Sequence, residues 1–174
     1  MSVVPVSGRP LLVVGVGNSL MTDDGIGIAA LERLRDGWEF DPDVELVDCP
    51  WPLTLLPEVE ESSGLLLIDA IDAKRAPGTV IELEGNEIPR YLDTKLSPHQ
   101  VGVRELLALC SLRGCLPVRT AALGIQPAVI ELGTELSPIV ARSLDALLLR
   151  VVGRLAAWGH ASFERREAPV ACTR

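Results

Sequence analysis

Near its amino end the chain reads Leu11-Leu12-Val13-Val14-Gly15-Val16-Gly17-Asn18-Ser19-Leu20-Met21-Thr22-Asp23-Asp24. The apolar run Leu11–Val14 is typical of a strand buried on both faces, as in a parallel sheet, and the glycines after it allow a sharp turn. From Asp23 to Arg35, apolar residues recur at helical spacing, with acidic residues at the start and basic residues at the end. This unit of strand, glycine turn and helix predicts an α/β fold.

The rest of the chain alternates in the same way. Further strands are predicted at 44–48, 65–68, 79–83 and 120–125, and helices at 53–60, from 98 to about 110 and from 138 to about 155. Ser97-Pro98 and Ser137-Pro138 each place a helix-capping residue before a proline suited to the first helical position. The turn before the strand at 79–83 is short, so this strand is expected to lie at an edge of the sheet or to run antiparallel to its neighbour. The sequence therefore predicts a mixed sheet.

Composition narrows the function classes. The chain has 174 residues, 48% hydrophobic content and a net charge of −8, so we expect one domain over 1–159 and a loose tail over 160–174. The negative charge argues against a nucleic-acid partner. No segment is typical of a signal peptide or a membrane span, so no membrane partner is expected. The four cysteines are sparsely placed, which indicates reduced thiols. The expected location is therefore the cytoplasm.

Three polar residues follow predicted strands or begin a predicted helix: Asp24, Asp69 and His99. If the first and third strands are neighbours, both carboxylates lie beyond the carboxyl ends of the sheet, where ligands bind in such folds. One of Asp23 and Asp24 is expected to satisfy free N–H groups at the helix start. His99 falls in the first turn of its helix, where the helix dipole favours the neutral ring that binds metal.

Two carboxylates and one imidazole suit zinc, nickel, manganese or iron. Three protein ligands leave positions open on the ion, as catalytic or substrate-completed metal sites do. The sequence therefore predicts an open metal site at Asp24, Asp69 and His99.

Other chemistries fit the residues less well. A dinucleotide-binding loop would need glycine at Leu20, and Asp23 and Asp24 would repel a pyrophosphate. Ser19 lacks the nucleophile-elbow pattern, while an aspartic dyad of Asp24 and Asp69 stays open but gives His99 no purpose. His160 is assigned no role, and Cys110 is expected to be a small buried hydrophobe.

Several short motifs, in order between Leu11 and about Leu155, resemble those of the hydrogenase maturation endopeptidases. The matching segments are Gly15-x-Gly17-Asn18-x-Leu20-x-x-Asp23-Asp24, Asp69-Ala70, Ala76-Pro77-Gly78-Thr79, Ser97-Pro98-His99-Gln100-x-Gly102 and Gly124-Ile125-Gln126-Pro127.

The resemblance implies a three-layer α/β/α sandwich around a twisted, mostly parallel five-stranded sheet. It also implies an endopeptidase that removes the C-terminal extension of a [NiFe] hydrogenase large-subunit precursor after nickel insertion. The family's metal-contacting positions map to Asp24, Asp69 and His99. Nickel would arrive on the substrate, so the isolated protein is expected to be metal-free. It is also expected to be a monomer, because nothing in the sequence demands more than one copy. The alternative function is a non-catalytic nickel checkpoint or metallochaperone protein that binds the loaded precursor.

One segment departs from that family. Relatives commonly carry a glycine-rich segment after the second strand, whereas this chain has Asp48-Cys49-Pro50-Trp51-Pro52. Two interpretations stay open: Cys49 contacts the substrate's cysteines, or a turn stiffened by proline packs Trp51 over the core.

Overall fold

A five-stranded sheet forms the centre of the computed structural model. The structure describes residues 8–49, 51–85, 87, 88 and 98–165. For residues 98–101 it describes the backbone only. The sheet strands are β1 (Leu11–Val16), β3 (Val44–Cys49), β4 (Gly64–Ala70), β5 (Val80–Glu84) and β6 (Arg119–Ile125). Their order across the sheet is β3-β1-β4-β6-β5. All neighbours are parallel except β5, an edge strand that runs antiparallel to β6, so the predicted mixed sheet is confirmed.

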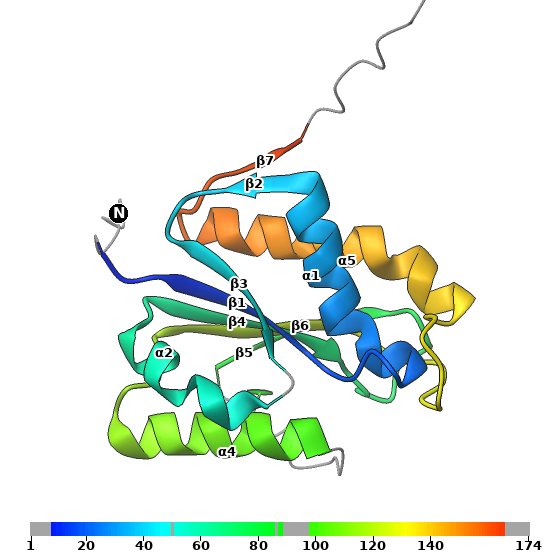
Figure 1. Ribbon diagram of the computed structural model, residues 1–174, viewed down its shortest axis with the longest axis horizontal. Coiled ribbons are helices and arrows are strands. Elements are labelled where there is room, and N and C mark those ends of the chain that lie inside the picture. Colours follow the sequence, from blue (N-terminus) through cyan, green and yellow to red (C-terminus); the bar gives the residue numbers. More distant parts are fainter. Residues whose placement is uncertain (1–7, 50, 86, 89–97, 166–174) are drawn as a thin grey trace, which may run out of the picture.

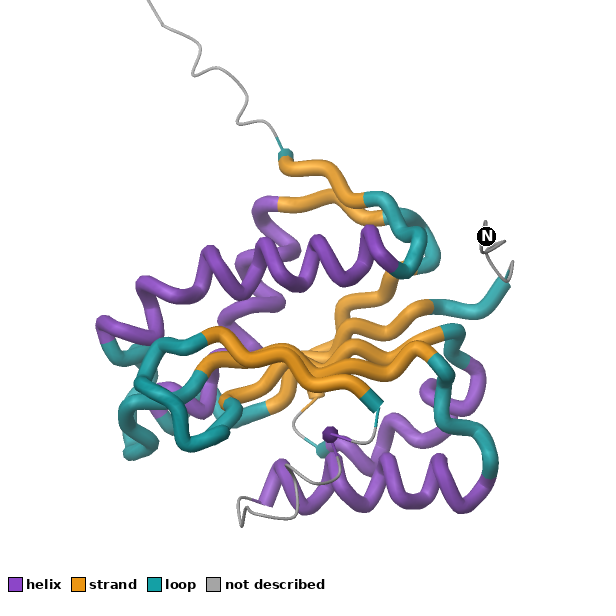
Figure 2. The backbone as a smooth tube through the Cα atoms, turned by 180° about the vertical axis from the view of Figure 1, so that it is seen from behind, coloured by secondary structure: helices purple, strands orange, loops and turns teal. Residues whose placement is uncertain are grey.

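Helices cover both faces of this sheet (Figures 1 and 2). The described helices are α1 (Ile26–Gly37), α2 (Leu56–Glu61), α4 (Pro98–Arg113) and α5 (Pro138–Ala157), with short 3-10 helices η1 (Thr22–Gly25) and η2 (Pro52–Leu55). Figure 1 shows α1 and α5 on one face and α2 and α4 on the other. The predicted three-layer α/β/α sandwich is confirmed.

The alternation of side chains along β1 explains why its sequence is continuously apolar. Leu11 and Val13 belong to the core beneath α1 and α5, while Leu12, Val14 and Val16 belong to the core beneath α2 and α4. A central parallel strand buries both of its faces, so each position needs an apolar side chain. Burying one leucine side chain stabilises the fold by about 1.5–3 kcal/mol, so the apolar residues on both faces of β1 stabilise the sheet.

The first predicted helix begins and ends later in the chain than expected. Residues 22–25 form η1, and the α-helix starts only at Ile26. The helices predicted from 98 and 138 do begin at Pro98 and Pro138. Cys110, a residue of α4, is fully buried in the core between this helix and the sheet, as predicted. Ser97, the predicted cap of α4, lies outside the described residues.

The expectation of a loose tail is wrong for the first residues of 160–174. Strand β7 (Ser162–Glu164) pairs antiparallel with β2 (Trp38–Phe40), a short strand that the sequence did not predict. His160 is buried, with 6% of its surface exposed, although the sequence assigned it no role. Both strands are only three residues long, too short for a periodic pattern to show in the sequence. Residues 166–174 lie outside the described range.

Candidate active site

The turn after β1 places Asp24 at the carboxyl edge of the sheet. Gly17 has φ +127°, a conformation that side chains with a Cβ rarely adopt, and a Cβ built there would lie 1.9 Å from the carbonyl oxygen of Asp24. The same Cβ would lie 3.9 Å from Asp69 Oδ1. Gly17 therefore permits a close contact between the turn and η1, at a corner that the Asp69 carboxylate also borders.

A second glycine brings α1 against two strands. A Cβ on Gly27 would lie 2.2 Å from the carbonyl oxygen of Val16 and 2.4 Å from that of Ile68. The amino end of α1 consequently crosses the carboxyl ends of β1 and β4 at backbone contact. The adjacency of the first and third predicted strands, on which the predicted convergence of Asp24 and Asp69 depended, is confirmed by the pairing of β1 with β4.

Asp24 is a buried carboxylate with a single hydrogen-bond partner among the residues that the structure describes. Its exposed fraction is 5%, and its Oδ2 accepts one hydrogen bond, from the backbone N–H of Asn18 at 3.0 Å. Among the described residues, Asp24 Oδ1 has no hydrogen-bond or ion-pair partner. A buried anionic oxygen without a donor is costly, so this atom favours a cation.

Asp69 lies at the end of β4 and is 7% exposed. Its Oδ1 accepts a hydrogen bond from the N–H of Ala70 at 2.7 Å. The residue also lines a small cavity whose other walls are apolar, among them Val103 of α4. The carboxylate is thus held at the edge of the apolar core beneath α4.

His99 is the second residue of α4, as predicted. It precedes Val103 by four residues, so the two positions share one face of the helix, and Val103 lines the cavity beside Asp69. Figure 1 shows the amino end of α4 at the same end of the sheet as the carboxyl ends of β1 and β4. The His99 side chain lies outside the described part of the chain, so its distance to the carboxylates stays a prediction.

Asp23, the acid next to Asp24, does not cap the start of the helix, the role predicted for one of these two acids. Among the described contacts, no side chain caps η1 or α1. Asp23 is fully buried and accepts four hydrogen bonds from the far end of the chain: from the N–H groups of Ala128, Val129 and Ser137, and from the Ser137 hydroxyl, at 2.7–3.0 Å. Asp23 therefore fastens the 128–137 loop to the segment that carries Asp24. No pattern in the sequence points to this pairing across more than 100 residues.

Replacing Asp23 with alanine should lower the free energy of unfolding by about 2 kcal/mol or more, because hydrogen bonds to a charged group contribute about 1.5–3 kcal/mol each and water can replace some of them. Urea titration followed by circular dichroism measures this. Asp36→Ala is the control, since Asp36 is exposed on the same segment of chain. Equal stability of the two variants would show that Asp23 does not fasten the loop.

The segment after β3 matches neither interpretation of the sequence. Cys49 is 2% exposed, and burial raises the pKa of its thiol, so it is kept from the surface and from the thiolate form. Trp51 is 68% exposed and does not pack over the core. Of these two side chains, the tryptophan and not the cysteine is exposed to solvent.

Gln126, the polar residue of the Gly124-Ile125-Gln126-Pro127 motif, makes two buried hydrogen bonds. The side chain is buried, and its amide donates to Asp72 Oδ1 at 3.0 Å while its carbonyl oxygen accepts from the N–H of Arg75 at 3.1 Å. These contacts join the end of β6 to the loop that follows β4. Gln126 is thus a structural residue of the carboxyl edge.

Comparison with known proteins identifies the family. A family model described as hydrogenase maturation protease matches residues 28–154. The hydrogenase 2 maturation protease of Escherichia coli is 33% identical over 147 residues, which cover 83% of this chain and 90% of that protein. The chain belongs to the hydrogenase maturation protease family. A hydrogenase expression/formation protein, HupD of Rhodobacter capsulatus, is 35% identical over 152 residues, covering 86% of this chain and 72% of the relative.

A solved structure gives the same result for the fold. The hydrogenase maturating endopeptidase HybD of Escherichia coli superposes with a TM-score of 0.85 at 31% identity, over 90% of this chain and 98% of that one. Membership makes this protein a peptidase that acts in hydrogenase maturation. Within the described residues, no helix combines the length and apolar character needed to cross a bilayer.

Proposed function

We propose that this peptidase removes the C-terminal extension of a [NiFe] hydrogenase large-subunit precursor, and that Asp24, Asp69 and His99 recognise the nickel that the precursor carries. The observation that supports this most is the buried Oδ1 of Asp24, which lacks a partner among the described residues. The backbone of Asp24 packs against Gly17, which also lies near Asp69 Oδ1. An imidazole in the first turn of α4 completes a donor set suited to nickel.

Recognition of the ion would make metal loading a condition for cleavage. Nickel held by the precursor has open coordination positions, and carboxylate oxygens and an imidazole that occupy them bind the loaded precursor more tightly than the empty one. The ion then supplies a Lewis acid beside the scissile bond. In this proposal, residues of η1, β4 and α4 act together to test the substrate and to position it.

The reaction is the hydrolysis of one peptide bond. Water oxygen adds to the carbonyl carbon, the carbon–nitrogen bond breaks, and the leaving amine takes a proton. The ion polarises the carbonyl or the attacking water, and one of the two carboxylates accepts the water proton. The chain's own contribution is to hold both acids, largely shielded from solvent, at one edge of a rigid sheet.

The proposed setting is the cytoplasm, where thiols stay reduced. Cys49, Cys110 and Cys115 are free, and burial together with the neighbouring Cys115 raises the pKa of Cys110 to about 11. Cys110 and Cys115 do not form a metal-binding pair in this arrangement, since Cys115 Sγ donates to the carbonyl oxygen of Cys110 at 3.4 Å.

Incubation with a purified precursor, in nickel-loaded and metal-free forms, tests the proposal. Mass spectrometry should show loss of the C-terminal peptide from the loaded precursor and an intact metal-free precursor. Equal cleavage of both forms would contradict nickel recognition. A stable complex without a change in precursor mass would instead support a non-catalytic checkpoint protein.

A further inference from the structure

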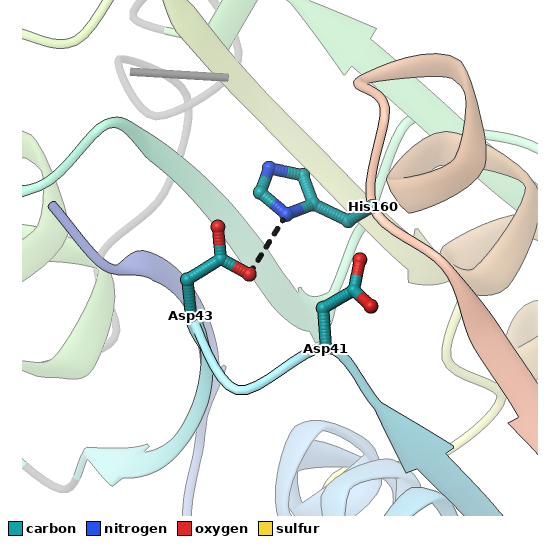
Figure 3. A group of neighbouring side chains, drawn as sticks. All are labelled: Asp41, Asp43 and His160. Carbon is teal, nitrogen blue, oxygen red and sulfur yellow. Dashed lines mark hydrogen bonds and ion pairs between the residues drawn. The ribbon is translucent and has the colours of Figure 1, made fainter. Parts of the chain in front are cut away.

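A second cluster of metal-ligating side chains lies at the opposite edge of the sheet. Asp41 and Asp43 lie in the connection between β2 and β3, and His160 lies between α5 and β7 (Figure 3). One oxygen of each carboxylate and one ring nitrogen lie within 4.8 Å of one another. The N–H of Leu11 donates to the carbonyl oxygen of Asp43, so the cluster sits where the parallel strands begin, away from Asp24 and Asp69.

The His160 ring is buried, and within the described part of the chain it has no partner at ordinary hydrogen-bond length. Only 6% of its side chain is exposed, and its Nδ1 lies 3.4 Å from Asp43 Oδ1, beyond the usual range of about 2.7–3.2 Å. Among the described residues, Nε2 has no hydrogen-bond partner. The ring nitrogen on the carboxylate side is thus Nδ1, which contacts Asp43 at a long distance, while Nε2 lies on the far side of the ring (Figure 3). An ion bound by Nδ1 and the carboxylates would replace this long contact with closer bonds.

One of the three donor separations matches an ion bound between its two atoms, and all three lie within 4.8 Å. In a tetrahedral site with bonds of about 2.0–2.1 Å, neighbouring ligand atoms lie about 3.3–3.4 Å apart. The distance of 3.4 Å between His160 Nδ1 and Asp43 Oδ1 has this value. The third ligand is already oriented, because the N–H of Ala161 donates to Asp41 Oδ2 at 2.6 Å.

The charge of the cluster also favours a cation. Two carboxylates face one neutral or basic ring, and no lysine or arginine in the described chain pairs with Asp41 or Asp43. Like charges at this separation repel each other unless a proton or a metal ion lies between them. An ion of charge +2 would balance both acids.

We propose that Asp41, Asp43 and His160 form a second site for a divalent transition-metal ion, of the zinc and nickel class. An imidazole with two carboxylates selects such ions over magnesium and calcium, which prefer oxygen ligands alone. Asp43 and His160 also line an open groove of about 540 Å³, through which the ion and its remaining water ligands can enter. The bound ion joins the β2–β3 connection to the α5–β7 connection and so holds the paired strands β2 and β7 against the domain.

Zinc titration of the full-length protein, freed of any histidine tag and stripped with EDTA, tests this site by calorimetry. His99→Ala serves as the background, since it removes a ligand proposed for the other edge of the sheet. The His99→Ala protein should bind one zinc ion through the new site, and adding His160→Gln should weaken this binding at least about 100-fold. Zinc should also raise the melting temperature of His99→Ala, because the ion binds only the folded state, and leave that of the double variant unchanged.

A second substitution, Asp43→Asn, tests the site in case the protein carrying His160→Gln fails to fold. Asp43 is the more exposed partner, so Asp43→Asn in the same background should keep the fold, as judged by circular dichroism, and lose zinc binding to the same degree. Magnesium in place of zinc should bind far more weakly. The site is refuted if His99→Ala binds no zinc, if both added substitutions leave zinc binding unchanged, or if magnesium binds as tightly as zinc.

Discussion

Replacing His99 with alanine should lower the rate of precursor processing at least about 100-fold, because loss of a metal ligand should cost more than the about 10–100-fold caused by loss of a group that only supports a ligand. The fold should persist, with the free energy of unfolding changed by no more than about 0.5 kcal/mol, because a residue in the first turn of a helix contributes little to the core. The measurement is the rate at which nickel-loaded precursor loses its C-terminal peptide, followed by mass spectrometry, with urea titration of the same variant.

Two further variants make this prediction specific. Asp24→Asn and Asp69→Asn keep the shape of each side chain and its ability to accept the hydrogen bonds from Asn18 and Ala70, but they remove the charge that binds the ion. Both should process as poorly as His99→Ala. Glu105→Ala, an exposed position on α4, is the matched control and should process normally. Normal processing by any of the three site variants would remove that residue from the metal-recognition set.

Replacing Gly27 with alanine should destabilise the protein by about 3 kcal/mol or more. Alanine favours a helix over glycine by about 1 kcal/mol, so propensity alone predicts a gain. Here the added Cβ would meet the carbonyl oxygens of Val16 and Ile68 at 2.2 and 2.4 Å. Backbone oxygens in a buried sheet cannot move aside, so the steric cost exceeds the gain, and α1 must shift with Asp24.

Gly153→Ala is the matched control for this change. Gly153 lies within α5, and a Cβ built there meets no atom within 4 Å. This variant should be more stable than the wild type by about 0.5–1 kcal/mol. Chemical denaturation of the two variants therefore should give opposite signs. If Gly27→Ala were as stable as Gly153→Ala, the close crossing of α1 over β1 and β4 would be wrong.

Local patterns predicted much of the fold correctly. The apolar runs located β1, β4 and β6, because burial acts on neighbouring residues. The serine–proline pairs located the starts of α4 and α5 through the proline, which suits the first helical position. Ser137 was expected to cap α5, but its side chain makes no capping hydrogen bond and its hydroxyl donates to Asp23 instead. The antiparallel edge strand β5 followed from the short turn before it. By contrast, β2 and β7 were missed, since three-residue strands leave no periodic signal and acquire their conformation from each other.

The sequence also predicted some of the functional and structural residues correctly and missed others. Chemistry and position along the chain singled out Asp24 and Asp69, and the pairing of β1 with β4 brought their segments to one corner. The task of Asp23 was mistaken for local capping, because its partners Ala128, Val129 and Ser137 are remote in sequence. His160 was set aside for a similar reason, since its neighbours Asp41 and Asp43 lie near the other end of the chain.

The sequence by itself determined the α/β class, the buried character of the central strands and the two acids and one histidine proposed to recognise nickel. Only the tertiary structure decided which acid has an oxygen left without a partner, which acid fastens a distant loop, and that a second histidine faces two carboxylates. The reason is physical: strand and helix propensities depend on near neighbours, whereas the partners of a buried charge are supplied by whichever segments the fold brings beside it.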